Sequence, residues 1–156
     1  MNIDKALKFF AVAEAVEGMS KDRSTKVGCA IIDDDFNVLS LGYNGFPRGV
    51  NDSVEERHER PTKYKFVVHS ETNAICNAAR KGTSLKDSTL IVTSLFPCSN
   101  CSGAIIQAGI KRIITSLPNN ERWIEDAEIS KVLFEESGVE VVYASRSESG
   151  IWLRNR

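Results

Sequence analysis

The amino-acid sequence predicts an α/β protein in which a mixed five-stranded sheet lies between two layers of helices. Two features carry this prediction. From residue 69 onward, short apolar segments alternate with helical stretches of about ten residues, which is typical of parallel crossover units. Before residue 69, one amphipathic segment and two neighbouring apolar segments predict a first helix and a β-hairpin.

The first helix is predicted over residues 2–18. Apolar side chains recur along it at three- and four-residue intervals: Ile3, Leu7, Phe10, Ala13 and Val16. This spacing places them on one helical face, and Gly18 marks the end of the helix. The apolar segments Val27–Ile32 and Val38–Tyr43 then flank a polar, turn-prone stretch at Asp33–Asn37, which predicts the hairpin.

Residues 44–66 are rich in Gly, Pro, Asn and charged residues, so they predict a long loop with one helical turn inside it. Loops of this length inside a compact domain are usually functional. The remaining helices are predicted at His69–Lys81, Ser99–Ala108 and Glu125–Ser137. The remaining strands are predicted at Thr89–Thr93, Lys111–Thr115 and Val139–Tyr143. Each of these helices is followed by a glycine, the residue that favours a helix C-terminus.

Length and composition fit one globular domain over residues 1–156. The apolar share is 42% and the charged share 26%, which excludes disordered and fibrous classes. The net charge is −1 and no run of Lys and Arg is present, so no long nucleic acid is expected as a partner. No apolar run approaches the roughly 18 residues of a membrane span, so we expect no membrane partner and a cytoplasmic location.

The chain has four cysteines, at positions 29, 76, 98 and 101. In a cytoplasmic protein they are expected to be reduced thiols. Cys98 and Cys101 form a C-x-x-C pair at the start of a predicted helix, a pattern shared by zinc sites and redox pairs. The N–H groups and the dipole at that position favour the thiolate form.

His69 and Glu71, at the start of the preceding predicted helix, favour a catalytic zinc site. One imidazole and two thiolates supply three ligands, which leaves the fourth tetrahedral position open for water. We expect both helix starts to meet at one edge of the sheet, with His69 supplied by an adjacent strand–helix unit. Glu71 lies two residues after His69, so its side chain points away from the ligand position and suits proton transfer.

Two other interpretations of these residues explain less of the pattern. A structural zinc would need a fourth protein ligand, and only Cys29, Cys76 and His58 remain as soft donors. The two cysteines fall on apolar segments, where small buried thiols are common, and the histidine lies in a charged loop. A thioredoxin-like redox pair would leave both His69 and Glu71 without a role.

The motifs H-x-E, at His69-Ser70-Glu71, and P-C-x-x-C, at Pro97–Cys101, resemble the zinc site of nucleobase deaminases. Other segments resemble the deoxycytidylate deaminase family: Gly42-Tyr43-Asn44-Gly45-Phe46-Pro47-Arg48-Gly49, Val67–Ile75, Leu95–Cys98 and Ile105–Lys111. The similarity covers roughly residues 3–143. It implies a cytidine-deaminase-like three-layer α/β/α fold and hydrolysis of deoxycytidine monophosphate (dCMP) to dUMP and ammonia, which supplies dUMP for thymidylate synthesis.

The resemblance also assigns the site. The ligands of Zn²⁺ are expected to be His69, Cys98 and Cys101, and the catalytic proton shuttle Glu71. The expected substrate-binding residues are Asn44 at the sugar hydroxyl, the backbone N–H of Ser70 at the cytosine carbonyl, and Val27 and Phe96 near the base. Asn44 has a second interpretation, because Asn-Gly is a strong turn dipeptide.

A substrate 5′-phosphate requires basic partners, and four candidates flank the predicted site: Arg23, Lys26, Arg48 and Lys65. Each is equally consistent with solvated surface charge. The resemblance further implies a homo-oligomer, often a hexamer, and regulation by the effectors dCTP and dTTP. Their contacts would lie in variable loops such as residues 44–66.

The sequence departs from the family pattern at two places. Ser70 and Ser102 stand where family members more often have Ala, which changes packing but leaves the backbone contacts available. Some relatives bind a second, structural zinc through the insertion. Here that loop offers only His58, which argues against a second zinc.

Three alternative functions share part of this pattern. Transfer-RNA adenosine deaminases share the two motifs but usually have Met at the position of Asn100 and lack the Gly42–Gly49 segment. Free cytidine deaminases usually have Cys at the position of His69. A catalytically silent zinc fold used for binding or assembly has no need of the carboxylate of Glu71.

Overall fold

The computed structural model describes residues 1–156 and contains one six-stranded sheet with the strand order β2-β1-β3-β4-β5-β6. The strands are β1 (Gly28–Ile32), β2 (Val38–Tyr43), β3 (Thr89–Val92), β4 (Arg112–Thr115), β5 (Glu140–Arg146) and β6 (Trp152–Arg154). Strand β1 runs antiparallel to both β2 and β3, whereas β3, β4 and β5 are parallel. The mixed sheet of the α/β prediction is therefore confirmed.

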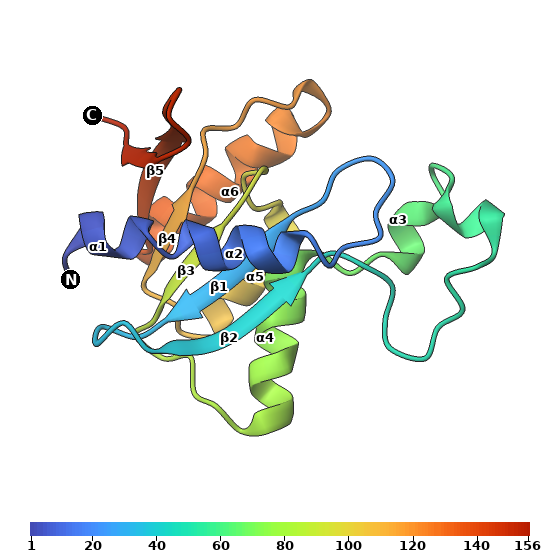
Figure 1. The fold of residues 1–156 in the computed structure, drawn as a ribbon, viewed down its shortest axis with the longest axis horizontal. Coiled ribbons are helices and arrows are strands. Elements are labelled where there is room, and N and C mark those ends of the chain that lie inside the picture. The colour runs from blue at the N-terminus through green and yellow to red at the C-terminus, as the bar shows by residue number, and fades with distance from the viewer.

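The helices are α1 (Ile3–Leu7), α2 (Phe10–Glu17), α3 (Lys63–Phe66), α4 (Ser70–Lys81), α5 (Ser99–Gln107) and α6 (Ile124–Ser137), with 3-10 turns η1 (Glu55–His58) and η2 (Glu121–Trp123). Helices α1 and α2 lie on one face of the sheet, and α4, α5 and α6 lie on the other (Figure 1). Each face has its own apolar core, one around Phe10 and Ile114 and the other around Ile31 and Phe134. The predicted three-layer arrangement is thus confirmed.

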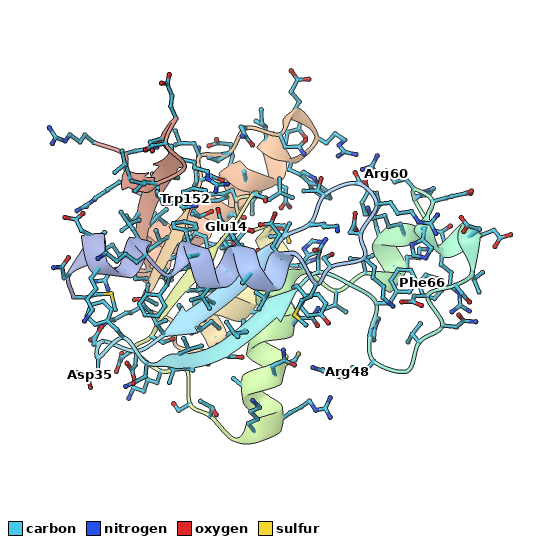
Figure 2. The ribbon with its side chains drawn as sticks, in the orientation of Figure 1. Glu14, Asp35, Arg48, Arg60, Phe66 and Trp152 are labelled. Atoms are coloured by element: carbon cyan, nitrogen blue, oxygen red, sulfur yellow. The ribbon has the colours of Figure 1, made fainter.

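The sheet has a sixth strand that the sequence analysis did not predict. Strand β6 has only three residues, too few to show the two-residue alternation by which strands are found. It pairs antiparallel with β5, and Trp152 stacks on Phe10 with ring centroids 3.8 Å apart. Its indole N–H donates to Glu14 of α2 at 2.7 Å (Figure 2). Tertiary contacts, and not local pattern, therefore define this strand.

The predicted N-terminal helix over residues 2–18 is interrupted. The backbone N–H groups of Lys8 and Phe9 donate to carbonyls three residues earlier, so the last turn of α1 tightens before α2 begins. The ring of Phe9 stacks on Phe36, from the loop between β1 and β2, at 6.3 Å. Helical periodicity alone did not show this break, because both short helices present apolar residues to the same face of the sheet.

The carboxyl ends of β2 and β3 lie at the same edge of the sheet, because both strands run antiparallel to the intervening β1. Helix α4 follows β2 through the insertion at residues 44–69, and α5 follows β3 directly. We expected these two strand–helix units to be adjacent, but strand β1 lies between β2 and β3. Their helix starts still meet at one edge.

Gly42 allows the start of α4 to pack closely against β2. A Cβ atom at this position in β2 would lie 2.4 Å from the carbonyl oxygen of Ser70 and 2.5 Å from the backbone nitrogen of Ala74. Only glycine allows the first turn of α4 to pack this closely on β2.

No helix in the structure combines the length and the apolarity that crossing a membrane requires.

Candidate active site

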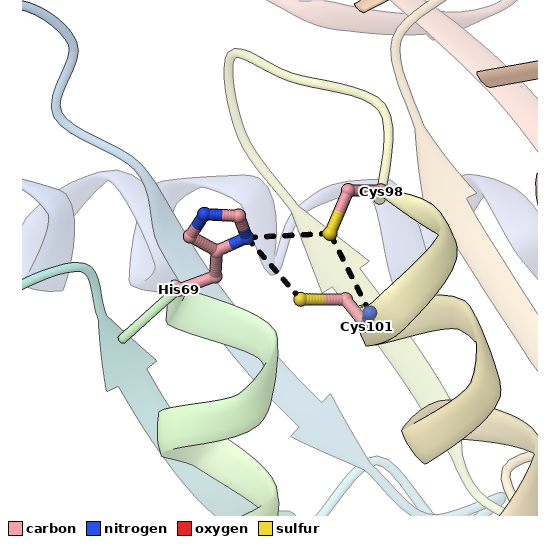
Figure 3. Close-up of side chains that lie close together, drawn as sticks. All are labelled: His69, Cys98 and Cys101. Atoms are coloured by element: carbon pink, nitrogen blue, oxygen red, sulfur yellow. Dashed lines mark hydrogen bonds between the residues drawn. The ribbon is translucent and has the colours of Figure 1, made fainter. Parts of the chain in front are cut away.

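Three potential metal ligands converge at the start of α4 and α5. His69 directly precedes α4, Cys98 is the N-cap residue of α5, and Cys101 lies in its first turn. The Nδ1 atom of His69 lies 3.4 Å from the Sγ atoms of both cysteines (Figure 3). The three ligand atoms all lie within 4.8 Å of one another. The predicted ligand set is thus brought together by two separate helices.

Without a metal, this group holds one negative and one positive charge. Hydrogen bonding with Cys98 raises the pKa of His69 to about 9, so the imidazole must lose a proton when it binds a metal. Hydrogen bonding with Cys101 and with His69 lowers the pKa of Cys98 to about 4, so this residue is a thiolate at neutral pH. The backbone N–H of Cys101 also donates to this sulfur at 3.5 Å. The hydroxyl of Thr72 lies 3.4 Å from the sulfur of Cys101. Hydrogen bonding with Cys98 and burial nevertheless raise the pKa of Cys101, so the negative charge of the metal-free pair lies on Cys98.

Glu71 is a buried carboxylate beside this group, with 4% of its surface exposed. Burial raises its pKa above the ordinary value, since a charged carboxylate loses its hydration there. It lines the same cavity as His69 and Cys98. A carboxyl group with a raised pKa in a cavity is suited to accept and return a proton.

The cavity beside the ligand group extends between the loop at residues 20–27, the insertion and the start of α6. Its lining includes four residues that the sequence analysis assigned to substrate: Val27, Asn44, Ser70 and Phe96. Asn44 is buried, and its side chain accepts from the Val27 N–H at 2.9 Å and donates to the Thr25 carbonyl at 2.8 Å. Asn44 therefore fixes the backbone of residues 25–27 while also lining the cavity, and it does not form the local Asn-Gly turn of its second interpretation.

A comparison with protein-family models matches residues 1–117 to the "Cytidine and deoxycytidylate deaminase zinc-binding region". This match covers most of the chain and includes every residue of the ligand group. The chain belongs to the cytidine and deoxycytidylate deaminase family.

Individual relatives agree with this assignment. The chain is 40% identical over 141 residues to an uncharacterized deaminase of Aliivibrio fischeri, covering 88% of this chain and 92% of the relative. It is 36% identical over 136 residues to human deoxycytidylate deaminase, covering 84% and 74%. The cyanophage S-TIM5 dCMP deaminase, solved in complex with dCMP and dUMP, superposes with a TM-score of 0.71 at 28% identity, covering 90% and 97%.

The residues present fit zinc, the metal for which this deaminase family is described. One imidazole nitrogen and two sulfurs, one of them a thiolate without any metal, are donors that zinc prefers. His69, Cys98 and Cys101 would hold it. The other soft donors lie elsewhere: Cys29 is buried in β1, Cys76 is exposed on α4, and the ring of His58 stacks on Phe46.

The basic residues expected at a phosphate are not among the residues that line the cavity of this deaminase. Arg23 is paired with Glu55 at 2.7 Å on the exposed surface, and Arg48 donates to Asn77 on α4 at 2.7 Å. Lys26 and Lys65 are exposed and do not line the cavity either. Figure 2 shows Arg48 beside α4, far from Arg60 on the insertion.

Three other basic residues line the cavity: Arg60, Lys63 and Arg122. The sequence analysis missed them because nothing in the local sequence distinguishes a cavity-facing cation from a solvated one. Two further lining residues, Tyr64 and Trp123, pack edge to face with ring centroids 5.8 Å apart. This contact joins the insertion to the start of α6.

Proposed function

We propose that this chain hydrolyses dCMP with water to dUMP and ammonia. One observation carries the proposal: His69 and Cys98 of the ligand group and the buried carboxyl group of Glu71 line a single cavity at the carboxyl edge of the sheet. A silent zinc fold would have no use for that carboxylate. The relatives named as deoxycytidylate deaminases support dCMP as the substrate over other cytosine compounds.

Glu71 performs the proton transfers of this reaction. Its carboxylate accepts one proton from the attacking water and delivers it to the cytosine ring nitrogen, where it stays. It then transfers the second proton of that water from the new C4 hydroxyl to the amine, which leaves as ammonia. When bound, zinc supplies a Lewis acid that lowers the pKa of water to roughly 7. The carbonyl at C4 that replaces the amine completes the uracil ring of dUMP.

The substrate contacts assigned from the resemblance are retained as part of this proposal. The backbone N–H of Ser70 would donate to the cytosine carbonyl, and Val27 and Phe96 would contact the base. Phe96 is held by ring contacts with Phe134 at 6.3 Å and Tyr143 at 6.2 Å. The amide of Asn44 is oriented by its two backbone partners, which leaves its remaining donor and acceptor for a sugar hydroxyl.

For the 5′-phosphate we propose Arg60 and Arg122 in place of Arg23, Lys26 and Arg48. Among the cations at the cavity, Lys63 is neutralised by Asp22 at 2.9 Å. The two arginines have no carboxylate partner. Arginine pairs well with the oxygens of a phosphate, because its N–H groups form a planar fork.

Ammonia release from dCMP, CMP, deoxycytidine, dCTP and a tRNA anticodon stem tests the substrate. We expect kcat/KM for dCMP to exceed that for deoxycytidine by about 10²–10⁴, the effect of two hydrogen bonds to a charged group. Equal values for these two would contradict the nucleotide assignment, and turnover of tRNA alone would favour the adenosine deaminase alternative. No turnover by zinc-loaded protein would favour the silent zinc fold.

The same assay tests the mechanism. Glu71→Gln removes the proton relay and should lower kcat by about 10²–10⁴ while zinc content stays at one per chain. The matched control is Glu56→Gln, on the exposed surface of the insertion, which should leave the rate unchanged. Normal turnover by Glu71→Gln would exclude this mechanism.

Other expectations remain proposals. Length and composition suggest a single domain over residues 1–156 and a cytoplasmic location, and the resemblance implies a hexameric homo-oligomer with dCTP and dTTP as effectors. The continuous six-stranded sheet with a core on each face supports the single domain. Exposed apolar side chains on α6, Ile129 and Val132, are compatible with self-association.

A further inference from the structure

The segment Pro97–Ser99, which carries Cys98 into α5, is bonded to two polar side chains of α6. The carboxylate of Asp126 accepts from the Ser99 N–H at 2.7 Å and from the Ser99 hydroxyl at 2.6 Å. The hydroxyl of Ser130, fully buried, donates to the Pro97 carbonyl at 2.8 Å. The residues on both sides of Cys98 are therefore fixed to α6.

Cys98 is the ligand that most needs such support. Cys101 lies within α5 and is 2% exposed, so its position is set by its own helix. Cys98 has extended backbone angles at the N-cap, so only its carbonyl takes part in the helical hydrogen bonds. Its carbonyl is fixed by the N–H and the hydroxyl of Ser102, both at 2.8 Å. Without α6, nothing comparable would fix the chain on its Pro97 side.

We propose that Asp126 and Ser130 are positioning residues that hold Cys98 where it can bind zinc. This inference rests on the proposed function, because it takes Cys98 to be a zinc ligand. Groups that orient metal ligands typically contribute 10–100-fold to metal affinity, since a ligand set must keep its geometry to within about half an ångström. Helix α6 lies beyond residues 1–117, so this support comes from a part of the chain that the family model does not match.

Substitutions at these contacts can separate the effect of the Asp126 charge from the effect of its hydrogen-bond geometry. In Asp126→Asn, the side-chain oxygen can accept from the Ser99 N–H while the amide donates to the Ser99 hydroxyl, which rotates to accept. The asparagine thus keeps both hydrogen bonds without the charge. Asp126→Ala loses both, and Ser99→Ala loses only the hydroxyl contact. Ser130→Ala loses the contact with Pro97 and a longer one, at 3.3 Å, with the backbone carbonyl of Asp126 in its own helix.

The rate of zinc release to an excess of a chromogenic chelator measures this positioning without any assay of deamination. We expect release about 10–100-fold faster from Asp126→Ala than from the wild type, and a smaller acceleration from Ser99→Ala and Ser130→Ala. The rate of zinc release from Asp126→Asn should stay within about threefold of the wild-type rate. The control is Glu128→Ala, an exposed residue on α6 whose carboxylate contacts only Lys131, which should release zinc at the wild-type rate.

Cobalt substitution provides a second readout. A displaced thiolate should shift and weaken the thiolate-to-cobalt absorption of Asp126→Ala, whereas Asp126→Asn should keep the wild-type spectrum. If Asp126→Ala fails to fold, the double variant Ser99→Ala/Ser130→Ala, which keeps the Asp126–Ser99 backbone bond, carries the same test. Its expected release is about tenfold faster than wild type.

Equal release from wild type, Asp126→Ala and Glu128→Ala, with one zinc bound to each, would overturn the positioning role and leave the proposed function standing. Fast release from both Asp126→Ala and Asp126→Asn would also overturn it, because hydrogen-bond geometry would not then be the cause. A wild-type protein that binds no zinc would instead overturn the proposed function. The two failures are therefore distinguishable.

Discussion

At the scale of single residues, the cavity separates two kinds of cation. Lys63 is largely buried and paired with Asp22, so little of its charge remains for a ligand. Arg60 donates to the hydroxyl of Ser24 at 2.7 Å, and Arg122 has no side-chain partner. An unpaired guanidinium beside a nucleotide cavity attracts phosphate more strongly than one already paired with a carboxylate.

Arg122→Ala should therefore lower kcat/KM for dCMP by about 10-fold or more, because a hydrogen bond to a charged group contributes roughly 1.5–3 kcal/mol. Turnover of deoxycytidine, which lacks the phosphate, should be unchanged. Arg60→Ala should behave similarly. The matched control is Arg48→Ala, since this side chain lies on Asn77 of α4. Equal losses with both substrates would show that the arginine does not contact the phosphate.

At the scale of elements, the insertion is bonded to the loop that follows α2. Four consecutive residues of this loop contact it: Lys21 to Asp52, Asp22 to Lys63, Arg23 to Glu55, and Ser24 to Arg60. Only the pair of Asp22 and Lys63 is buried, with side chains 4% and 14% exposed. The exposed pairs contribute little, so this one contact dominates the attachment.

The lowered pKa of Asp22 makes the stability of the folded protein depend on pH. Burial alone would raise this pKa, but hydrogen bonds from Lys63 and from the N–H groups of Ser24 and Thr25 together lower it below 3.8. The native state therefore binds fewer protons here than the unfolded chain. The stability that Asp22 contributes is present above about pH 4 and is lost as the pH falls through the lower folded pKa.

Asp22→Asn should reduce the free energy of unfolding at pH 7 by about 2 kcal/mol, the effect of a lost hydrogen bond to a charged group. This difference from the wild type should shrink as the pH falls from 5 to 3. Urea unfolding at several pH values measures it, with Asp52→Asn, from an exposed pair, as the control. A difference that stays constant over this range would contradict the pKa argument.

At the scale of the whole molecule, the last strand fastens the first helices to the sheet. Trp152 of β6 stacks on Phe10 at 3.8 Å with its ring plane 10° away, and Arg146 of β5 lies 3.4 Å from Glu14. Figure 2 shows Trp152 and Glu14 side by side above α2. The two ends of the chain thus share one apolar core, opposite the face that carries α4 and α5.

Trp152→Ala should lower the free energy of unfolding by about 3 kcal/mol, the low end for aromatic truncation, because this side chain is only partly buried. Thermal unfolding should then shift down by roughly 6–12 °C. Leu153→Ala, on the same strand but 53% exposed, should change stability by less than about 0.5 kcal/mol. A Trp152→Ala protein as stable as the wild type would show that this contact does not hold the N-terminal helices.

The sequence by itself determined the chemistry and most of the framework. His69, Glu71, Cys98 and Cys101 could be assigned because H-x-E and C-x-x-C each lie within a single helical turn, where spacing fixes relative placement. The five longer strands and the helices after residue 69 followed from local periodicity and glycine stops. All of these features depend on interactions between residues that are close together in the sequence.

Only the tertiary structure decided which distant residues join that centre. Arg60, Arg122 and Asp126 resemble any exposed charge in the sequence, and they reach the cavity because the insertion and the start of α6 fold over the sheet edge. Arg23 and Arg48 were equally good candidates, but Glu55 and Asn77 engage them elsewhere. Strand β6 likewise depends on the stacking of Trp152 on Phe10, a contact between residues near opposite ends of the chain. Such placements depend on long-range packing, which no local pattern encodes.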